Sequence, residues 1–144
     1  HNIYGTPTTL NPKFSQVIPA LCRKVILDKK LKVWGSGKQR RAFLHVDDVV
    51  QALILIMKKG MKKGVIQIGP EKSTSISEIA KKIVKISGKN IKIVFDTSKP
   101  EGDKDRSANI DKARKILKWK QEIDLDEGLR KVFEWTLKEL NYKK

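Results

Sequence analysis

The sequence predicts a mixed α/β fold, a small helix-rich domain with short paired strands. Segments with helical spacing of apolar residues alternate with short strand-like segments along the chain. The 144 residues suffice for one domain but not for two. Hydrophobic residues make up 39% and charged residues 33% of the composition, as in soluble globular proteins rather than disordered tails.

The first part of the chain is expected to form a loop, a helix and two strands. Residues 1–13 are rich in Gly, Pro and Thr, which predicts a loop that follows a strand lying before it. Apolar residues recur at helical spacing over Phe14–Asp28, with a local irregularity expected at Pro19. Strands are expected at Leu31–Trp34 and Arg41–Val46, on either side of a Gly-Ser-Gly turn.

A helix that is apolar around most of its circumference follows the second strand. Asp47 or Asp48 is its expected N-cap, because a carboxylate there can accept hydrogen bonds from free amides, and the helix runs from Val49 to about Lys59. Such a helix is buried on more than one side, so we expect it to pack against a partner domain absent from this chain. Its apolar stretch is far shorter than the roughly 20 residues that cross a bilayer.

The second part of the chain contains a clear helix start. Ser75-Ile76-Ser77-Glu78 matches the capping-box pattern, and Gly88 is placed to end the helix that follows. The other expected elements are strands at Val65–Gly69 and Ile91–Phe95, a loop at Lys99–Ser107, a short helix capped by Asp111 that ends near Trp119, and a last helix within Leu125–Tyr142.

The net charge of +16 suggests a basic nucleic-acid-binding module as one hypothesis. However, most of the 32 basic residues are Lys, they occur in runs of at most two, and no aromatic residues interleave with them as a stacking platform. We therefore favour solvated helix faces and loops for these lysines, with the nucleic-acid module kept as an alternative.

Two reactive residues are expected to be structural. Cys22 lies at an apolar helical position and belongs in the core, and since a single cysteine forms no internal disulfide, a reducing cytoplasm is the favoured location. His45 is expected to be partly buried and hydrogen-bonded. No Cys/His cluster has metal-ligand spacing, so no metal site is predicted.

Three motifs lie in order along the chain. They are Asn2-Ile3-Tyr4-Gly5, the run V-W-G-S-G-K-Q-R-R-A-F-L-H-V-D-D-V at Val33–Val49, and Pro100–Trp119. Together they resemble the extended short-chain dehydrogenase/reductase family of NAD-dependent sugar-nucleotide epimerases and dehydratases, with GDP-mannose 3,5-epimerase and UDP-glucose 4-epimerase as the nearest subgroups. The resemblance implies the C-terminal, substrate-binding part of a Rossmann-type enzyme, with residues 1–13 trailing the Rossmann domain and residues 14–144 forming the substrate-binding domain.

The resemblance also implies a site for a nucleoside diphosphate sugar. It places Arg41 and Arg106 on the phosphates, and a planar guanidinium fork suits phosphate oxygens better than an ammonium group. Alternatively, each arginine forms a salt bridge, for example with Asp103 or Asp105.

Four further residues complete the implied substrate site. Trp34 would form the edge of the base pocket, unless it is a core residue. Val17 and Ile18 would contact the base and ribose through their backbone groups. Asn2 would reach the sugar or a phosphate, unless its side chain only holds its own turn.

The parts of the family that hold NAD and perform the chemistry are missing from this sequence. The family binds NAD on a G-x-x-G-x-x-G turn and takes a proton with the tyrosine of Y-x-x-x-K, and neither motif is present. We therefore expect no catalytic, cofactor-binding or metal-binding residue here, NAD on a missing N-terminal half, a homodimeric parent and no activity for the fragment alone. A non-catalytic nucleotide-sugar sensor of the same fold is an alternative.

Overall fold

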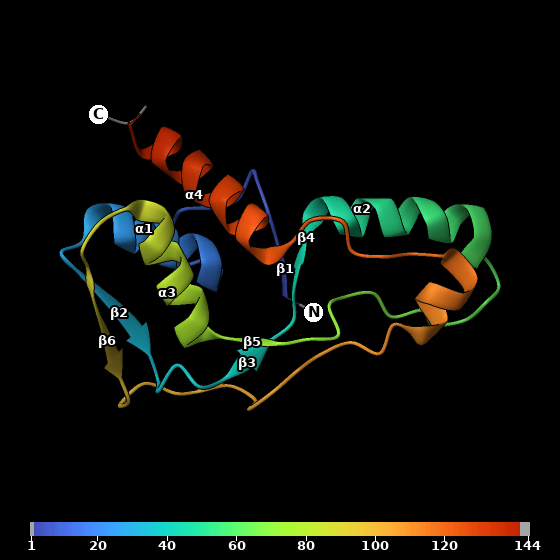
Figure 1. The fold of residues 1–144 in the computed structure, drawn as a ribbon, viewed down its shortest axis with the longest axis horizontal. Helices are drawn as coiled ribbons and strands as arrows, with labels where there is room; N and C mark the ends of the chain where they lie inside the picture. Colours follow the sequence, from blue (N-terminus) through green and yellow to red (C-terminus); the bar gives the residue numbers. More distant parts are fainter. Residues whose placement is uncertain (1, 142–144) are drawn as a thin grey trace.

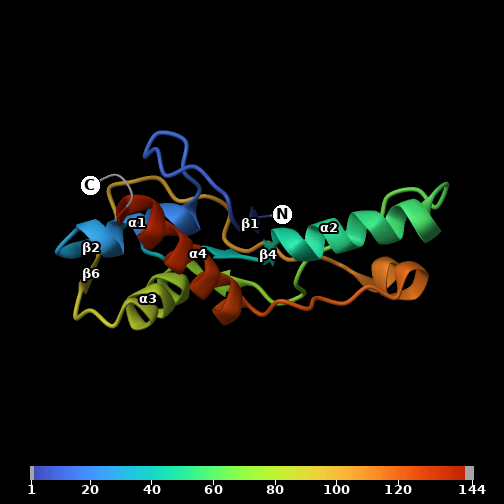
Figure 2. The same ribbon diagram turned by 90° about the horizontal axis from the view of Figure 1, so that it is seen from above.

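The computed structural model describes residues 2–141, which form an elongated molecule with a larger and a smaller lobe (Figures 1 and 2). The elements are β1 (Asn2–Tyr4), α1 (Val17–Leu27), β2 (Lys30–Trp34), β3 (Arg40–Arg41), β4 (Phe43–His45), α2 (Val46–Leu55), the π-helical turn η1 (Ile56–Gly60), β5 (Thr74–Ser75), α3 (Ile76–Ser87), β6 (Lys92–Asp96), the π-helical turn η2 (Ala113–Leu117) and α4 (Leu125–Asn141). The larger lobe contains α1, α3, α4, β2 and β6, and the smaller lobe contains α2, η1 and η2.

The strands pair in three separate two-stranded sheets. Strands β1 and β4 are parallel, with Tyr4 opposite His45. Strands β2 and β6 are also parallel, from Lys30 opposite Lys92 to Trp34 opposite Asp96, and β3 pairs with β5 in antiparallel fashion. The mixed α/β fold with short paired strands is thus confirmed.

Three helices and the β2–β6 pair enclose the core of the larger lobe. Its fully buried side chains include Val25, Leu31, Ile79, Ile83 and Leu129. Helix α3 presents one apolar face to this core, and its ends are fixed as the sequence predicts. Ser75 and Glu78 form the capping box, and Gly88 ends the helix with φ +64°.

The smaller lobe packs around Trp119, which is 1% exposed. The indole Nε1 donates to the main-chain oxygen of Asp48 at 3.3 Å, and the Asp48 carboxylate accepts from the amides of Glu122 and Ile123. This buried aspartate ties the first turn of α2 to the segment that leads back to α4. Among the described residues, no helix combines the length and the apolar character needed to span a membrane.

Some predicted boundaries in the first part of the chain are wrong. Residues 2–4 form a strand, because β4, about forty residues later, supplies its pairing partner. The expected strand at 41–46 breaks at Ala42, whose amide donates to the main-chain oxygen of Arg106, and its two halves join different sheets. Helix α1 begins at Val17 rather than at Phe14, and Pro19 lies in its first turn, where no amide partner is required.

Side-chain contacts explain three further differences. The N-cap of α2 is His45, not Asp47 or Asp48, because the His45 Nδ1 accepts from the Asp47 amide at 3.3 Å. Residues 65–69 form no strand, since their hydrogen-bond partners are single groups of a later segment. The Asn109 amide donates to Gln67 Oε1, and the Lys112 ammonium donates to the Val65 main-chain oxygen. Asp111 is a helical residue whose amide donates to the Asn109 side chain, so it is not the predicted cap. Tyr142, the predicted end of the last helix, lies outside the described residues.

Candidate functional site

A cavity of about 580 Å³ opens between the loop before α1, α1 itself, β2 and β3. This volume is typical of small-molecule sites. Of the described residues that line it, five are Lys or Arg and none is Asp or Glu. The residues are Asn2, Leu10, Pro12, Lys13, Ser15, Val17, Ala20, Leu21, Arg23, Lys24, Lys32, Val33, Trp34, Gln39, Arg41, Ile76 and Gly102. Such a lining favours an anionic ligand.

The Gly-Ser-Gly turn lies between two residues of the cavity lining, Trp34 and Gln39. Gly35 and Gly37 have φ values of +74° and +73°, which residues with a Cβ rarely adopt. The Gly35 amide donates to Asp96 at the end of β6, and the oxygen of Gly37 accepts from the Ser77 amide at 2.9 Å. The turn is therefore held against both the β2–β6 pair and the start of α3.

Trp34 stands at the cavity edge, directly before this turn. Its side chain is 59% exposed, so the interpretation of Trp34 as a core residue is wrong. The Lys99 ammonium lies 6.0 Å from the centre of the indole ring. A flat, accessible indole at this edge can stack on a planar ring.

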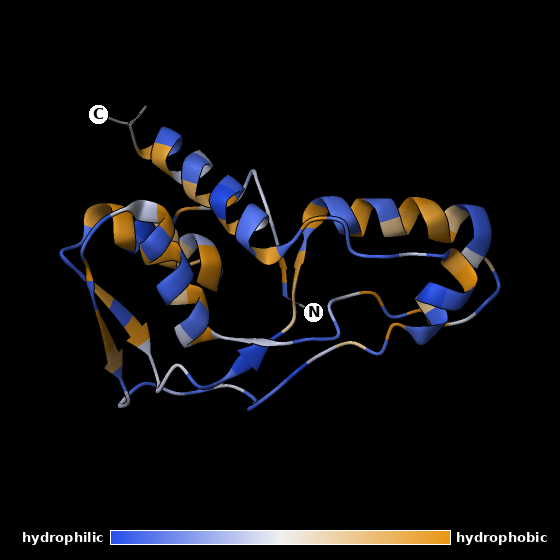
Figure 3. Cartoon of the chain, in the orientation of Figure 1, coloured by the Kyte–Doolittle hydropathy of each residue, from blue (hydrophilic) through white to orange (hydrophobic). Residues whose placement is uncertain are grey.

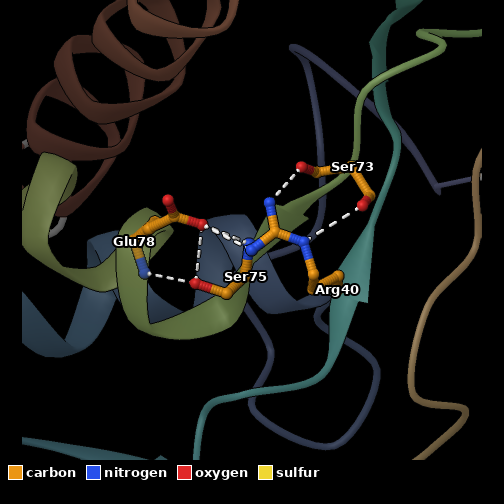
Figure 4. A network of polar contacts seen from close by, with 4 residues as sticks. All are labelled: Arg40, Ser73, Ser75 and Glu78. Atoms are coloured by element: carbon orange, nitrogen blue, oxygen red, sulfur yellow. Dashed lines mark hydrogen bonds and ion pairs between the residues drawn. The ribbon is translucent and has the colours of Figure 1, made fainter.

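Adjacent arginines in β3 serve different purposes. Arg40 donates to the hydroxyl and main-chain oxygen of Ser73 and pairs with Glu78 at 3.3 Å, which fixes the capping box of α3 to β3 (Figure 4). Arg41 lines the cavity instead, because successive side chains of a strand point to opposite faces. Its Nη1 donates to the main-chain oxygens of Arg40 and Asp103, each at 2.6 Å.

Arg106 does not line the cavity in this structure. Its side chain is 69% exposed and forms an ion pair with the Asp103 carboxylate, three residues earlier in the same loop. The salt-bridge alternative for Arg106, with Asp103 as the partner, is therefore the arrangement in this structure.

The remaining predicted site residues divide between cavity and core. Asn2 and Val17 line the cavity, whereas Ile18 is 1% exposed and packs in the core of the larger lobe. The structure thus brings Asn2, Val17, Trp34 and Arg41 together and leaves Ile18 and Arg106 outside the lining.

Several cationic lining residues were not among the predicted site residues. Lys24 faces the cavity from α1 and donates to the main-chain oxygen of Lys32 at 3.0 Å. The signal was present in the sequence, since Lys24 lies seven residues after Val17 and therefore on the same helix face. Lys13 gave no comparable signal, because its position depends on how the loop before α1 folds back. Arg23 lies in α1 next to Lys24 and also lines the cavity.

Cys22 lies in the core as predicted, whereas His45 is fully rather than partly buried, and among the described residues only its Nδ1 has a hydrogen-bond partner. Burial raises the pKa of the Cys22 thiol to about 12, so this cysteine stays protonated within the core. His45 is 3% exposed, and burial lowers its pKa, the nearby Asp47 carboxylate opposing this shift. In the part of the chain that the structure describes, no group of His, Cys, Asp and Glu side chains could hold a metal ion.

Comparison with known proteins relates this chain to one enzyme family. Residues 1–69 match the model of the NAD-dependent epimerase/dehydratase family. A putative GDP-L-fucose synthase of Arabidopsis thaliana is 33% identical over 99% of this chain. The chain belongs to the extended short-chain dehydrogenase/reductase family.

Solved structures of the extended short-chain dehydrogenase/reductase family show the same arrangement. A GDP-6-OMe-4-keto-L-xylo-heptose reductase from C. jejuni is 28% identical with a TM-score of 0.86, over 96% of this chain and 52% of that one. UDP-glucose 4-epimerase from Thermotoga maritima, solved with UDP-glucose, is 27% identical with a TM-score of 0.86, over 96% and 44%. UDP-glucose 4-epimerase is one of the two subgroups that the sequence motifs resemble, whereas GDP-L-fucose synthase is not one of these two.

The chain spans about half the length of the relatives it matches, and 45% of the Arabidopsis protein. The family is NAD-dependent, but the Gly35–Gly37 turn does not fit a dinucleotide pyrophosphate. It follows β2 and leads into β3 rather than into a helix, and the Gly37 oxygen and Gly35 amide are already bonded within the protein.

Proposed function

We propose that this chain is the nucleotide-sugar-binding portion of an NAD-dependent enzyme that epimerises, dehydrates or reduces a sugar nucleotide. The observation that carries the proposal is the cavity whose lining has five cationic side chains and no carboxylate. In a site of this kind the Arg41 guanidinium would hold the pyrophosphate, and Trp34 would cover the base.

The proposal gives the chain's own residues binding and positioning roles only. Arg41 and Trp34 would fix the nucleotide, and Asn2 would orient the sugar toward the half that carries NAD. The described residues provide no exposed proton-transfer group in the lining other than lysines, so the fragment alone would turn over no substrate.

Guanosine is the base that we propose. The Arabidopsis relative and the C. jejuni reductase are both named for GDP-sugars, whereas the Thermotoga epimerase is named for a UDP-sugar. Calorimetric titration of the chain with GDP and with UDP tests this choice. Tighter binding of UDP would reject guanosine and leave the nucleotide-sugar proposal standing.

Replacement of Arg41 tests the phosphate contact. Arg41→Ala should weaken GDP binding by at least about tenfold, since loss of a charge-assisted contact costs roughly 1.5–3 kcal/mol. The matched control is Arg114→Ala in the smaller lobe, which removes an equal charge from an exposed ion pair with Glu71. Equal affinities for both variants would contradict a specific phosphate contact and favour binding by net charge alone, as in a nucleic-acid-binding module.

We further propose that the NAD-binding half packs on α2. Val50, Leu53, Ile54, Met57 and Met61 are between 46% and 74% exposed and recur at helical spacing, so none of the residues from 2 to 141 covers this apolar face of α2 and η1 (Figure 3). The adjacent β1–β4 pair has only two strands, so its edges can extend into a larger sheet.

Complex formation with a separately expressed NAD-binding half of a relative tests this docking face. Leu53→Asp should abolish co-elution of the two chains on gel filtration. Leu27→Asp is the matched control, since Leu27 at the end of α1 is 50% exposed and Leu53 is 52% exposed. Loss of the complex in both variants, or in neither, would reject α2 as the docking face.

A further inference from the structure

Both arginines that the sequence assigns to phosphate binding contact the same acidic residue. The Asp103 carboxylate pairs with Arg106, and its main-chain oxygen accepts from Arg41 Nη1 at 2.6 Å. Arg106 and Asp103 are 69% and 54% exposed, so this pair lies at the surface beside the cavity and not in the core.

The loop that carries Asp103 is held in place at several points. Glu101 accepts from the Ser36 amide in the Gly-Ser-Gly turn. The amides of Arg40 and Ala42 donate to the main-chain oxygens of Lys104 and Arg106, each at 2.9 Å. Gly102 lines the cavity next to the Arg41 guanidinium. Asp103 therefore lies between two residues held by hydrogen bonds, Glu101 and Lys104, and directly after Gly102 of the cavity lining.

We propose that Asp103 is an internal counter-anion that competes with the ligand's phosphates for Arg106. In this structure its carboxylate pairs with this guanidinium, and Arg106 is not part of the cavity lining. A diphosphate displaces the carboxylate, and Arg106 then swings toward the cavity beside Arg41. This inference rests on the proposed function and adds a residue that lowers the affinity for phosphate-bearing ligands.

The competition affects only ligands that use Arg106. A nucleoside without phosphates has no group that displaces the carboxylate, so its affinity does not depend on Asp103. A diphosphate both breaks the ion pair and meets the negative charge of the released carboxylate. Exposed ion pairs contribute up to about 1 kcal/mol, so removal of the carboxylate should tighten diphosphate binding roughly three- to fivefold.

Calorimetry with GDP and guanosine on the chain and its Asp103→Asn variant tests the proposal. The variant should bind GDP several times more tightly and guanosine equally well. Asp105→Asn is the matched control, since it makes the same change in net charge two residues away, and it should alter GDP affinity by less than about twofold. In the Arg106→Ala background, Asp103→Asn should no longer increase GDP affinity.

Each other outcome has a distinct meaning. Weaker GDP binding by Asp103→Asn would overturn the proposal, because the carboxylate would then contact the ligand directly. Equal gains from Asp103→Asn and Asp105→Asn would also overturn it, since the effect would be one of net charge. If the unmodified chain binds no GDP or UDP and Arg41→Ala changes nothing, the proposed function itself fails. GDP binding that depends on Arg41 but not on Asp103 would reject the counter-anion alone.

Discussion

Asp48 connects the two lobes through a single buried carboxylate. It is 2% exposed and accepts two main-chain hydrogen bonds, from Glu122 at 2.8 Å and from Ile123 at 3.3 Å. Asp48→Ala leaves both amides without their partner and should destabilise the protein by about 2–3 kcal/mol in urea unfolding. Asp47→Ala is the control, because the Asp47 side chain is 65% exposed, and it should cost less than about 1 kcal/mol. Similar losses for both variants would contradict the role assigned to Asp48.

His45 should make the stability depend on pH near neutrality. Burial lowers its folded-state pKa below the ordinary value of 6.5, despite the opposing effect of Asp47. As the pH falls below 6.5, His45 becomes protonated in the unfolded chain before it does so in the folded chain. The stability that the folded chain has above pH 6.5 is therefore lost progressively as the pH falls toward the lowered folded-state pKa.

Urea midpoints at about pH 7.5 and about pH 5 measure this effect, since carboxylates titrate mostly below this window. His45→Asn keeps a side-chain acceptor at the N-cap of α2 but does not titrate. Its midpoint should change less between the two pH values than that of the unmodified chain. An unchanged pH dependence in the variant would assign the effect to another group.

At the scale of single elements, the start of α3 depends on its capping box. The Ser75 hydroxyl accepts from the Glu78 amide, and the Glu78 carboxylate accepts from the Ser75 amide at 2.8 Å, which lowers the pKa of Glu78. Ser75→Ala should cost about 1 kcal/mol in the free energy of unfolding. Ser77→Ala in the same turn should cost less, because its side chain takes no part in the cap; the reverse order would contradict the assignment.

Elements determined by neighbouring residues could be predicted from the sequence, and those determined by distant partners could not. The capping box, Gly88 and the short apolar segments of β2 and β6 are local signals, and the predicted elements at these positions are confirmed. The break at Ala42 depends on the oxygen of Arg106, and strand β1 depends on β4. No local pattern records these contacts.

The same distinction applies to the candidate site. Trp34 and Arg41 could be found because they belong to one continuous motif that forms a strand, a turn and a strand. The family resemblance placed Arg106 on the phosphates, but the loop conformation pairs it with Asp103. The conformation of this loop depends on its contacts with β3 and with the Gly-Ser-Gly turn, and the motif around Arg106 does not contain that information.

At the scale of the whole molecule, the two lobes should differ in local stability. The smaller lobe has the smaller buried cluster and leaves one face of α2 in contact with solvent. Amides of α2 and η1 should therefore exchange faster in hydrogen–deuterium exchange than those of α3 and α4. Addition of an NAD-binding half should slow exchange in α2 specifically. Equal protection of the amides of both lobes from exchange, before the NAD-binding half is added, would contradict the expected difference in local stability.

The path of the chain between the lobes determines which features could be exchanged between relatives. The chain passes between the lobes between β4 and α2, between η1 and β5, between β6 and η2, and between η2 and α4 (Figure 1), so a chimera that replaces the smaller lobe needs a junction at every passage. By contrast, most of the described residues of the cavity lining lie between Asn2 and Arg41, and Ile76 and Gly102 are added from later in the chain. A single recombination event near Ala42 would therefore transfer most of the proposed nucleotide site and leave the proposed docking face on α2 unchanged.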